Sequence, residues 1–240
     1  MPDNFPTISK PSISNMPIPP NLIDYEKTKK DFDWFKDGFS KLDWLPDGGL
    51  NNAYEAVDRH VKNGKGSYNA LIWLGKNGEE ETYTYSEFKE ESDKFGQVMK
   101  NLGMKRGDRI FIFMDRIPEL YFAAMGILKA GGVIAPLFSA FGPDPVRDRM
   151  EDAGASFLIT TPELKTKINS ILPNIKTLQK VIIIDKLNRS KIDPDNLTLS
   201  YDELMKSVDA NSFVIEPTTQ YDFSIMHYTS GSTGKPKGVL

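Results

Sequence analysis

Short, wholly apolar runs alternate with helical patterns through the middle of the chain. The runs are bounded by glycine, proline or polar residues, which predicts buried strands at 109–114, 133–137, 157–160 and 181–184. Between them, apolar residues recur every three to four positions, which predicts helices at 118–130, 145–153 and 162–172. Strands that are buried on both faces and separated by helices are typical of right-handed βαβ units. The pattern therefore predicts an α/β fold, with a mainly parallel sheet and helices on both faces.

Turn and cap signals define the elements on either side of this region. Asn77-Gly78 is a strong signal for a hairpin turn between two short strands. Thr84 and Glu87 have the spacing of a capping box, so a helix is expected to begin there and to end at Gly103. The remaining expected elements are strands at 69–74, 81–85 and 223–228, a helix at 50–60 capped by Asn51 or Asn52, and a helix at 201–207.

The N-terminal part of the chain differs in composition from the rest. Residues 1–20 are rich in proline and poor in large apolar side chains, which predicts a disordered or extended arm. Residues 21–49 place aromatic side chains among many charges and end in Pro46-Asp47-Gly48-Gly49. They are expected to form an N-terminal extension, helical over 21–44, that docks on the body. The body itself is expected to span 50–240.

Composition and charge narrow the class of protein. Hydrophobic residues make up 39% and charged residues 26% of the 240, which is ordinary for a globular protein. The net charge of −3 gives no electrostatic reason to expect nucleic acid or an anionic membrane as a partner. The absence of cysteine excludes thiolate metal sites, and two histidines are too few for a histidine-based metal site. No apolar run suits a spanning helix or a secretory signal, so a cytoplasmic location is expected.

Residues 228–238 read YTSGSTGKPKG and have the chemistry of a phosphate-binding loop. The glycines let backbone N–H groups approach an anion, while the hydroxyls add donors and the lysines add positive charge. We call residues 229–238 the phosphate loop. Its candidate phosphate ligands are Thr229, Ser230, Gly231, Ser232, Thr233, Gly234, Lys235 and Lys237.

The composition of this segment also allows two other interpretations. The common nucleoside-triphosphatase loop needs four residues between its first glycine and its Gly-Lys pair, whereas only Ser232-Thr233 separate Gly231 from Gly234-Lys235, and Pro236 follows. A flexible Ser/Gly linker would have the same composition. The order and spacing of the residues favour phosphate binding over a linker.

The phosphate loop, with the tyrosine before it, resembles the signature of the adenylate-forming superfamily, which includes acyl-CoA synthetases, luciferases and peptide-synthetase adenylation domains. The resemblance is greatest to acetyl-CoA synthetases and covers nearly the whole chain after residue 20. Residues 21–44 resemble the N-terminal extension of acetyl- and propionyl-CoA synthetases. Further matching segments are LNNAYEAVDRH at 50–60, TYSEF at 84–88, KRGDR at 105–109 and GILKAGGVIAP at 126–136.

The resemblance implies a two-step reaction. ATP and a carboxylic acid, with acetate favoured, give an acyl-adenylate and pyrophosphate, and CoA then displaces AMP to form a thioester. The phosphate loop would hold the β- and γ-phosphates together with Mg²⁺. The basic residues Arg147, Arg149, Lys165 and Lys167 are candidates for binding the phosphates of CoA, as the resemblance implies. The residues that bind the adenine, the ribose and the acyl group, and the catalytic residues, are expected after Leu240. The 240 residues are therefore expected to be an N-terminal fragment that is inactive alone and has an uncovered apolar sheet edge.

Alternatives remain open at this point. The acid could be another short-chain, medium-chain or aromatic one, because the acyl pocket of the superfamily lies later in the chain. The chain could also be a truncated, non-catalytic protein that binds a nucleotide or a partner. The sequence carries no signal of the oligomeric state.

Overall fold

The computed structural model describes residues 9, 11–186, 196–229, 234 and 236–240. Contacts between residues divide the chain into two compact units, Met1–Leu42 and Asp43–Leu240. Within the described residues, no helix combines the length and the apolar character that crossing a membrane requires.

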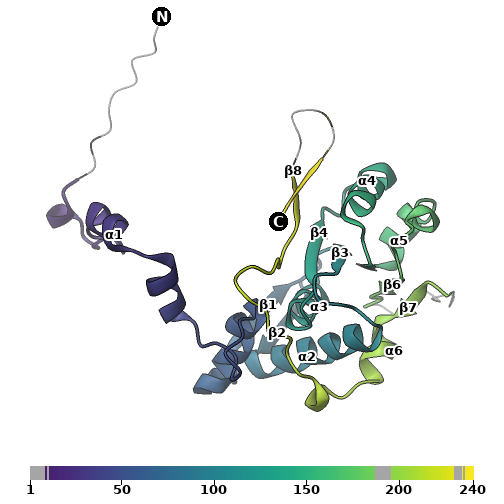
Figure 1. The fold of residues 1–240 in the computed structure, drawn as a ribbon, viewed down its shortest axis with the longest axis horizontal. Coiled ribbons are helices and arrows are strands. Elements are labelled where there is room, and N and C mark those ends of the chain that lie inside the picture. Colours follow the sequence, from purple (N-terminus) through teal and green to yellow (C-terminus); the bar gives the residue numbers. More distant parts are fainter. Residues whose placement is uncertain (1–8, 10, 187–195, 230–233, 235) are drawn as a thin grey trace, which may run out of the picture. The chain divides into compact units, whose positions relative to one another are not determined.

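Short helical turns make up the described part of the N-terminal unit (purple in Figure 1). Asp24 caps helix α1 (Tyr25–Asp31) by accepting a backbone N–H at 3.0 Å. Trp34 meets Phe32 edge to face, with the ring centroids 5.0 Å apart. The helical character expected of residues 21–44 is confirmed, whereas docking of this segment on the body stays a prediction. The remaining turns are η1 (Ile13–Asn15), η2 (Trp34–Gly38) and η3 (Phe39–Lys41).

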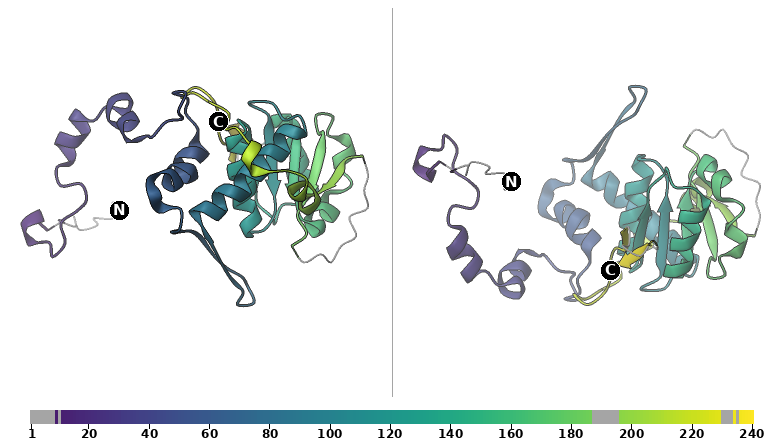
Figure 2. Two further views of the ribbon diagram at one scale, coloured as in Figure 1. Left: turned by 90° about the horizontal axis from the view of Figure 1, so that it is seen from below. Right: turned by 90° about the horizontal axis from the view of Figure 1, so that it is seen from above.

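A five-stranded parallel sheet forms the centre of the larger unit (Figures 1 and 2). In spatial order its strands are β4 (Val133–Leu137), β3 (Arg109–Phe113), β5 (Phe157–Thr160), β6 (Lys180–Ile183) and β7 (Thr198–Ser200). The four strands predicted from apolar runs are confirmed, and so is the α/β fold. The strand β7 was missed because its three residues, TLS, are mostly polar and form no recognisable run.

Helices cover both faces of this sheet, as predicted. Successive side chains of a strand point to opposite faces, so Ile110 and Ile112 of β3 join one core cluster, while Phe111 and Phe113 join the other. The first cluster is covered by α2 (Tyr85–Asn101), α3 (Pro118–Lys129) and α6 (Tyr201–Lys206), and the second by α4 (Pro143–Ala153) and α5 (Pro162–Ile168). Two short turns complete this part: η6 (Leu172–Asn174) and η7 (Ala210–Ser212).

A hairpin and a helical segment lie beside α2. The hairpin pairs β1 (Asn69–Leu74) with β2 (Glu80–Thr84) in antiparallel fashion, and the capping box of Thr84 and Glu87 then starts α2, both as predicted. The helical segment after Asn51 contains η4 (Tyr54–Asp58) and η5 (Val61–Lys65). Asn51 caps it, because its side-chain oxygen accepts the N–H groups of Ala53 and Tyr54 at 3.0 and 3.2 Å.

The strand predicted at 223–228 is partly wrong. Only Ile225 pairs with β4, in a single parallel bridge to Ile134, and β8 (His227–Thr229) pairs instead with β9 (Lys237–Val239). Pro136 explains why the hydrogen bonds between this segment and β4 end early. The N–H of Ile134 bonds to Ser224, and the next donor on that edge of β4 would be residue 136, which has no N–H. The chain therefore leaves the sheet and forms a separate hairpin.

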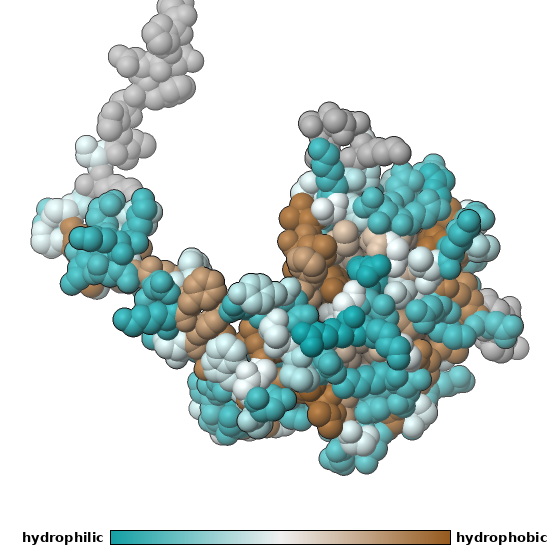
Figure 3. Space-filling model, viewed as in Figure 1, coloured by the Kyte–Doolittle hydropathy of each residue, from teal (hydrophilic) through white to brown (hydrophobic). Residues whose placement is uncertain are grey.

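The β4 edge of the sheet carries exposed apolar side chains. Phe138 is 66% exposed, Phe223 58% and Ile225 37%. Figure 3 shows apolar surface below the β8–β9 hairpin on this side of the unit. This edge is the part of the sheet where the sequence led us to expect uncovered apolar groups.

Candidate phosphate-binding site

The phosphate loop is carried by the β8–β9 hairpin. Thr229, at the end of β8, is in register with Lys237 at the start of β9. Gly234 has a φ of +88°, which is the left-handed region that favours glycine. The hairpin thus places two of the predicted phosphate ligands, Thr229 and Lys237, side by side, and Gly234 lies in the loop between its strands. The other five, Ser230, Gly231, Ser232, Thr233 and Lys235, lie outside the described residues.

The hairpin rises at the carboxyl end of the central sheet. The segment leading to it runs parallel to β4 through the Ile134–Ile225 bridge, so β8 continues towards the end at which β4 finishes (Figure 1). In open α/β sheets, ligands bind outside the carboxyl ends of the strands. The sheet therefore presents the loop where this architecture places ligands.

Gly238 lies close against the side chains of Met226 and Tyr228, so a side chain at position 238 would have to displace them. A Cβ built on Gly238 would lie 2.4 Å from Cε of Met226 and 3.3 Å from Cζ of Tyr228. Met226 is buried in the core cluster beneath α4, and Tyr228 packs against the same cluster. The last glycine of the motif therefore serves packing of the hairpin on the body.

Tyr228 connects β8 to helix α4. Its hydroxyl lies 2.8 Å from Oδ2 of Asp152 and 3.0 Å from the carbonyl oxygen of Arg149. Partial burial of the phenol, together with its bond to the Asp152 carboxylate, raises the pKa of Tyr228 above its usual value. The phenol therefore stays protonated and remains a donor. Neither Asp152 nor this contact was predicted, since the two residues are 76 positions apart and nothing in the sequence links them.

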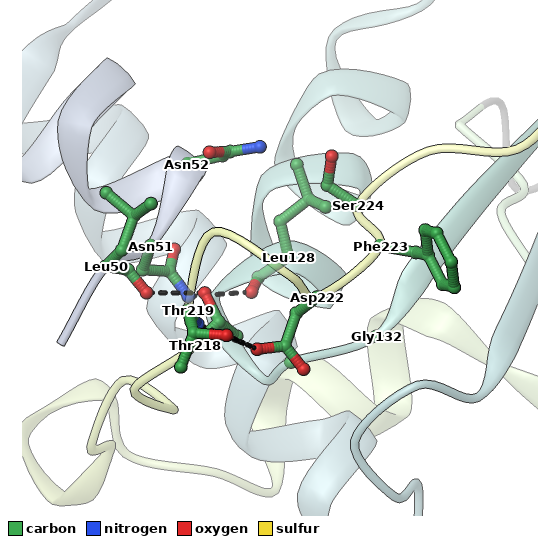
Figure 4. A pocket seen from close by; sticks show the side chains of 11 residues that line it. Leu50, Asn51, Asn52, Leu128, Gly132, Thr218, Thr219, Asp222, Phe223 and Ser224 are labelled. Atoms are coloured by element: carbon green, nitrogen blue, oxygen red, sulfur yellow. Dashed lines mark hydrogen bonds between the residues drawn. The ribbon is translucent and has the colours of Figure 1, made fainter. Parts of the chain in front are cut away.

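The segment before the hairpin is bonded to the start of the body. Thr218 and Leu50 exchange backbone hydrogen bonds of 2.8 Å in each direction. The amide of Asn51 donates to the carbonyl of Leu128 at 2.9 Å (Figure 4) and to that of Glu216 at 3.1 Å. The cavity that Leu50, Asn51, Leu128 and Thr218 help to line holds about 30 Å³, which is room for about one water molecule and too little for a nucleotide.

Arg106 and Asp222 form a second attachment of the same segment. The guanidinium binds the carboxylate with two N–H groups, one of them with Nε 2.9 Å from Oδ1. Asp222 also accepts the backbone N–H of Thr219 at 2.7 Å. The bond from Arg106, followed by those from Thr219, lowers the pKa of Asp222 to about 2. The sequence motif KRGDR at 105–109 contained Arg106, but its distant partner could not be read from it.

Three of the four basic residues considered for CoA phosphates, Arg147, Arg149 and Lys167, contact other groups in this structure. Arg147 pairs with Asp144 and Asp148, each at 2.8 Å. The guanidinium carbon of Arg149 lies 4.5 Å from the ring centroid of Phe141, and Lys167 lies 3.2 Å from the carbonyl oxygen of Ala140. A role for these groups in binding CoA stays a prediction.

Comparison with known proteins assigns the class of this chain. The AMP-binding enzyme family matches residues 57–240, and the chain belongs to that family. The acetyl-coenzyme A synthetase of Bacillus subtilis is 39% identical over 221 residues, which cover 92% of this chain and 37% of the relative. The acetyl-coenzyme A synthetase of Rubrobacter xylanophilus is 31% identical over 245 residues, covering 90% of this chain and 38% of the relative. The chain thus spans under two fifths of the length of these relatives.

Solved structures agree on the fold. An acyl-CoA synthetase of Brucella canis superposes with a TM-score of 0.77 at 24% identity, over 90% of this chain and 37% of that one. An anthranilate CoA ligase in complex with anthranoyl-AMP gives a TM-score of 0.66 at 21% identity, over 80% of this chain and 33% of that one. The predicted family and fold are therefore both confirmed.

Proposed function

We propose that the chain binds the triphosphate of ATP in an AMP-forming ligase that converts acetate to acetyl-adenylate and then to a CoA thioester. The observation that carries this proposal is the position of the phosphate loop, on a hairpin at the carboxyl end of the sheet, in a chain whose relatives are acetyl-coenzyme A synthetases. The partners proposed are small molecules: ATP, a carboxylic acid and CoA. The absence of cysteine agrees with the reducing cytoplasm, which is the location we propose.

The chemistry required of the loop is neutralisation and orientation of the leaving pyrophosphate. Hydroxyls such as that of Thr229 would donate to phosphate oxygens, and Lys237 would place a positive charge beside them. Mg²⁺ suits this donor set as a companion of the phosphates, because it is commonly held by substrate phosphates and a few protein oxygens. The described residues contain no group of three or more His, Asp or Glu side chains that could hold a metal without such help.

Binding of magnesium-bound ATP tests the phosphate part of the proposal. Titration calorimetry on the 240-residue chain is expected to show binding of MgATP and of magnesium pyrophosphate. Lys237→Met should weaken both affinities by about 10- to 100-fold, since it removes a charged contact. Lys176→Met, at an exposed lysine between η6 and β6, is the matched control and should change neither. A cooperatively folded wild-type chain that binds neither ligand at millimolar concentration would overturn the proposal.

Turnover is a separate question from binding. The loop supplies contacts to the phosphates, whereas adenylate formation also requires that the acid be held in line with the α-phosphate. We therefore propose that the 240 residues alone bind MgATP without turning acetate over. Acetate-dependent exchange of pyrophosphate into ATP measures this directly, and robust exchange by the isolated chain would contradict it.

A further inference from the structure

We propose that Tyr228 and Asp152 are positioning residues, whose hydrogen bond fixes the phosphate-loop hairpin on helix α4 and thereby sets the affinity of the loop for a triphosphate. The part of this inference that concerns affinity rests on the proposed function. The part that concerns the placement of the hairpin rests on the geometry alone.

The geometry makes the phenol a shared donor. Tyr228 has one hydroxyl proton and faces two acceptors, Oδ2 of Asp152 at 2.8 Å and the carbonyl oxygen of Arg149 at 3.0 Å. The carboxylate is the stronger acceptor because it is charged, and it is also the nearer one. Asp152 lies in the last turn of α4, so the bond joins the strand to the end of a helix that is packed on the sheet.

Aromatic contacts hold the same ring in place. The guanidinium carbon of Arg149 lies 5.7 Å from the ring centroid of Tyr228 and 4.5 Å from that of Phe141. One N–H of Arg149 also donates to the carbonyl of Pro145 at 2.7 Å, within α4. The ring therefore lies against a cation that is itself fixed to the helix.

Tyr228 lies immediately before the phosphate loop, where the part of the hairpin that the structure describes has few other hydrogen bonds to the body. The ladder to β4 ends at Met226, because Pro136 cannot donate, and β8 beyond it is only three residues long. Within the described residues of the hairpin, the side-chain hydrogen bonds to the rest of the unit are those of Tyr228. Thr229, the first residue of the phosphate loop, follows immediately.

The tyrosine ring supports both strands of the hairpin. A Cβ on Gly238 would lie 3.3 and 3.4 Å from two carbons of that ring, so β9 lies directly against it. A shift of the phenol would therefore move both ends of the phosphate loop together. A purely structural tyrosine elsewhere in the unit would affect stability without this coupling to the loop.

The test compares Tyr228→Phe and Asp152→Asn with two matched controls. Tyr221→Phe makes the same chemical change at a tyrosine that is 82% exposed, and Glu151→Gln neutralises the exposed carboxylate next to Asp152. Trypsin reports on the hairpin, because it cleaves after Lys237 when β9 detaches, whereas the bond after Lys235 is protected by the following proline. Hydrogen exchange of residues 227–229 and 237–239 and the MgATP affinity are measured on the same proteins.

Loss of the phenol hydroxyl should speed cleavage after Lys237 and exchange in the hairpin by about tenfold, and weaken MgATP binding by about the same factor. Asp152→Asn, which keeps an oxygen acceptor without the charge, should give a smaller change in each. The controls and the melting temperature of the unit should stay at wild-type values.

Two results would overturn the inference. One is cleavage and exchange in Tyr228→Phe equal to those in Tyr221→Phe. The other is a hairpin that loosens only to the extent that the melting temperature of the whole unit falls. That result would make the tyrosine a general stabiliser. A wild-type chain that fails to bind MgATP would defeat the proposed function, and cleavage and exchange would still decide whether the phenol places the hairpin.

Discussion

Lys129 is completely buried, and two carboxylates neutralise its ammonium group. Its Nζ lies 2.7 Å from Asp58 and 2.6 Å from Asp93, and Lys89 lies 2.5 Å from the second oxygen of Asp93. The cluster ties the helical segment after Asn51 to α2 and α3, because each of these elements contributes a charge. Burial raises the pKa of Asp58, and the nearby lysines oppose that rise. An isolated charge in this position would be costly, so the members of the cluster depend on one another.

Removing the buried cation should therefore destabilise the protein strongly. Lys129→Met leaves the buried carboxylates of Asp58 and Asp93 with Lys89 as their remaining paired cation, and it is expected to lower the free energy of unfolding by about 3–5 kcal/mol. Urea denaturation at pH 7 measures this. The control is Lys94→Met, because Lys94 pairs with Glu90 and Glu91 on the partly exposed side of α2, and its loss should cost under about 1 kcal/mol. Equal effects of the two substitutions would contradict the view that the cluster is a buried unit.

Helices α2 and α3 approach each other closely through glycine. A Cβ built on Gly126 would lie 2.7 Å from the carbonyl oxygen of Ser92 and 2.9 Å from the backbone nitrogen of Gly96. These atoms belong to the backbone of α2, so a change of rotamer cannot relieve the contact. Two glycines in facing helices thus set the distance between the helices that cover one face of the sheet.

A methyl group at this crossing should force the helices apart. Gly126→Ala gains about 1 kcal/mol of helix propensity, but overpacking against backbone costs about 1–3 kcal/mol or more. We expect a net loss of about 1–2 kcal/mol in the free energy of unfolding, measured by chemical denaturation. Gly142→Ala provides the comparison, since a Cβ there meets nothing within 4 Å. Stability of Gly126→Ala at or above the wild type would show that the helices can separate freely.

The sequence predicted elements better than the contacts between them. Apolar runs identified β3 to β6, and the Thr84–Glu87 spacing identified the start of α2, because these signals are local. The phosphate loop was also predicted from local spacing. The bond of Tyr228 to Asp152 and the burial of Lys129 depend on residues far away in the chain, so periodicity could not reveal them. The sequence does contain one signal for Lys129, because it is the single charged residue in the apolar-rich stretch 120–137.

At the scale of the whole molecule, the core belongs to the larger unit. The buried members of its three apolar clusters lie between Val57 and Met226. The beginning of this unit is fixed by Glu55, whose carboxylate accepts the N–H groups of Asp43 and Trp44 at 3.0 and 2.8 Å. Trp44 has a φ of +56°, which is rare for a residue with a side chain, and these bonds hold that conformation. Residues 43–240 thus contain their own core and the contacts that hold their first residues.

A chain that begins at Asp43 should therefore fold as the 240-residue chain does. We expect its melting temperature to lie within about 2 °C of that of the 240-residue chain, and its unfolding to remain a single transition. Removing residues 1–50 instead deletes the buried Leu45 and the backbone bonds between Leu50 and Thr218. That deletion should cost about 2.5–6 kcal/mol, from one buried leucine and two hydrogen bonds. It should also weaken MgATP binding, because Thr218 begins the segment that leads to the phosphate loop. Equal losses of stability in the two deletions would place part of the core before Asp43 and refute this division of the chain.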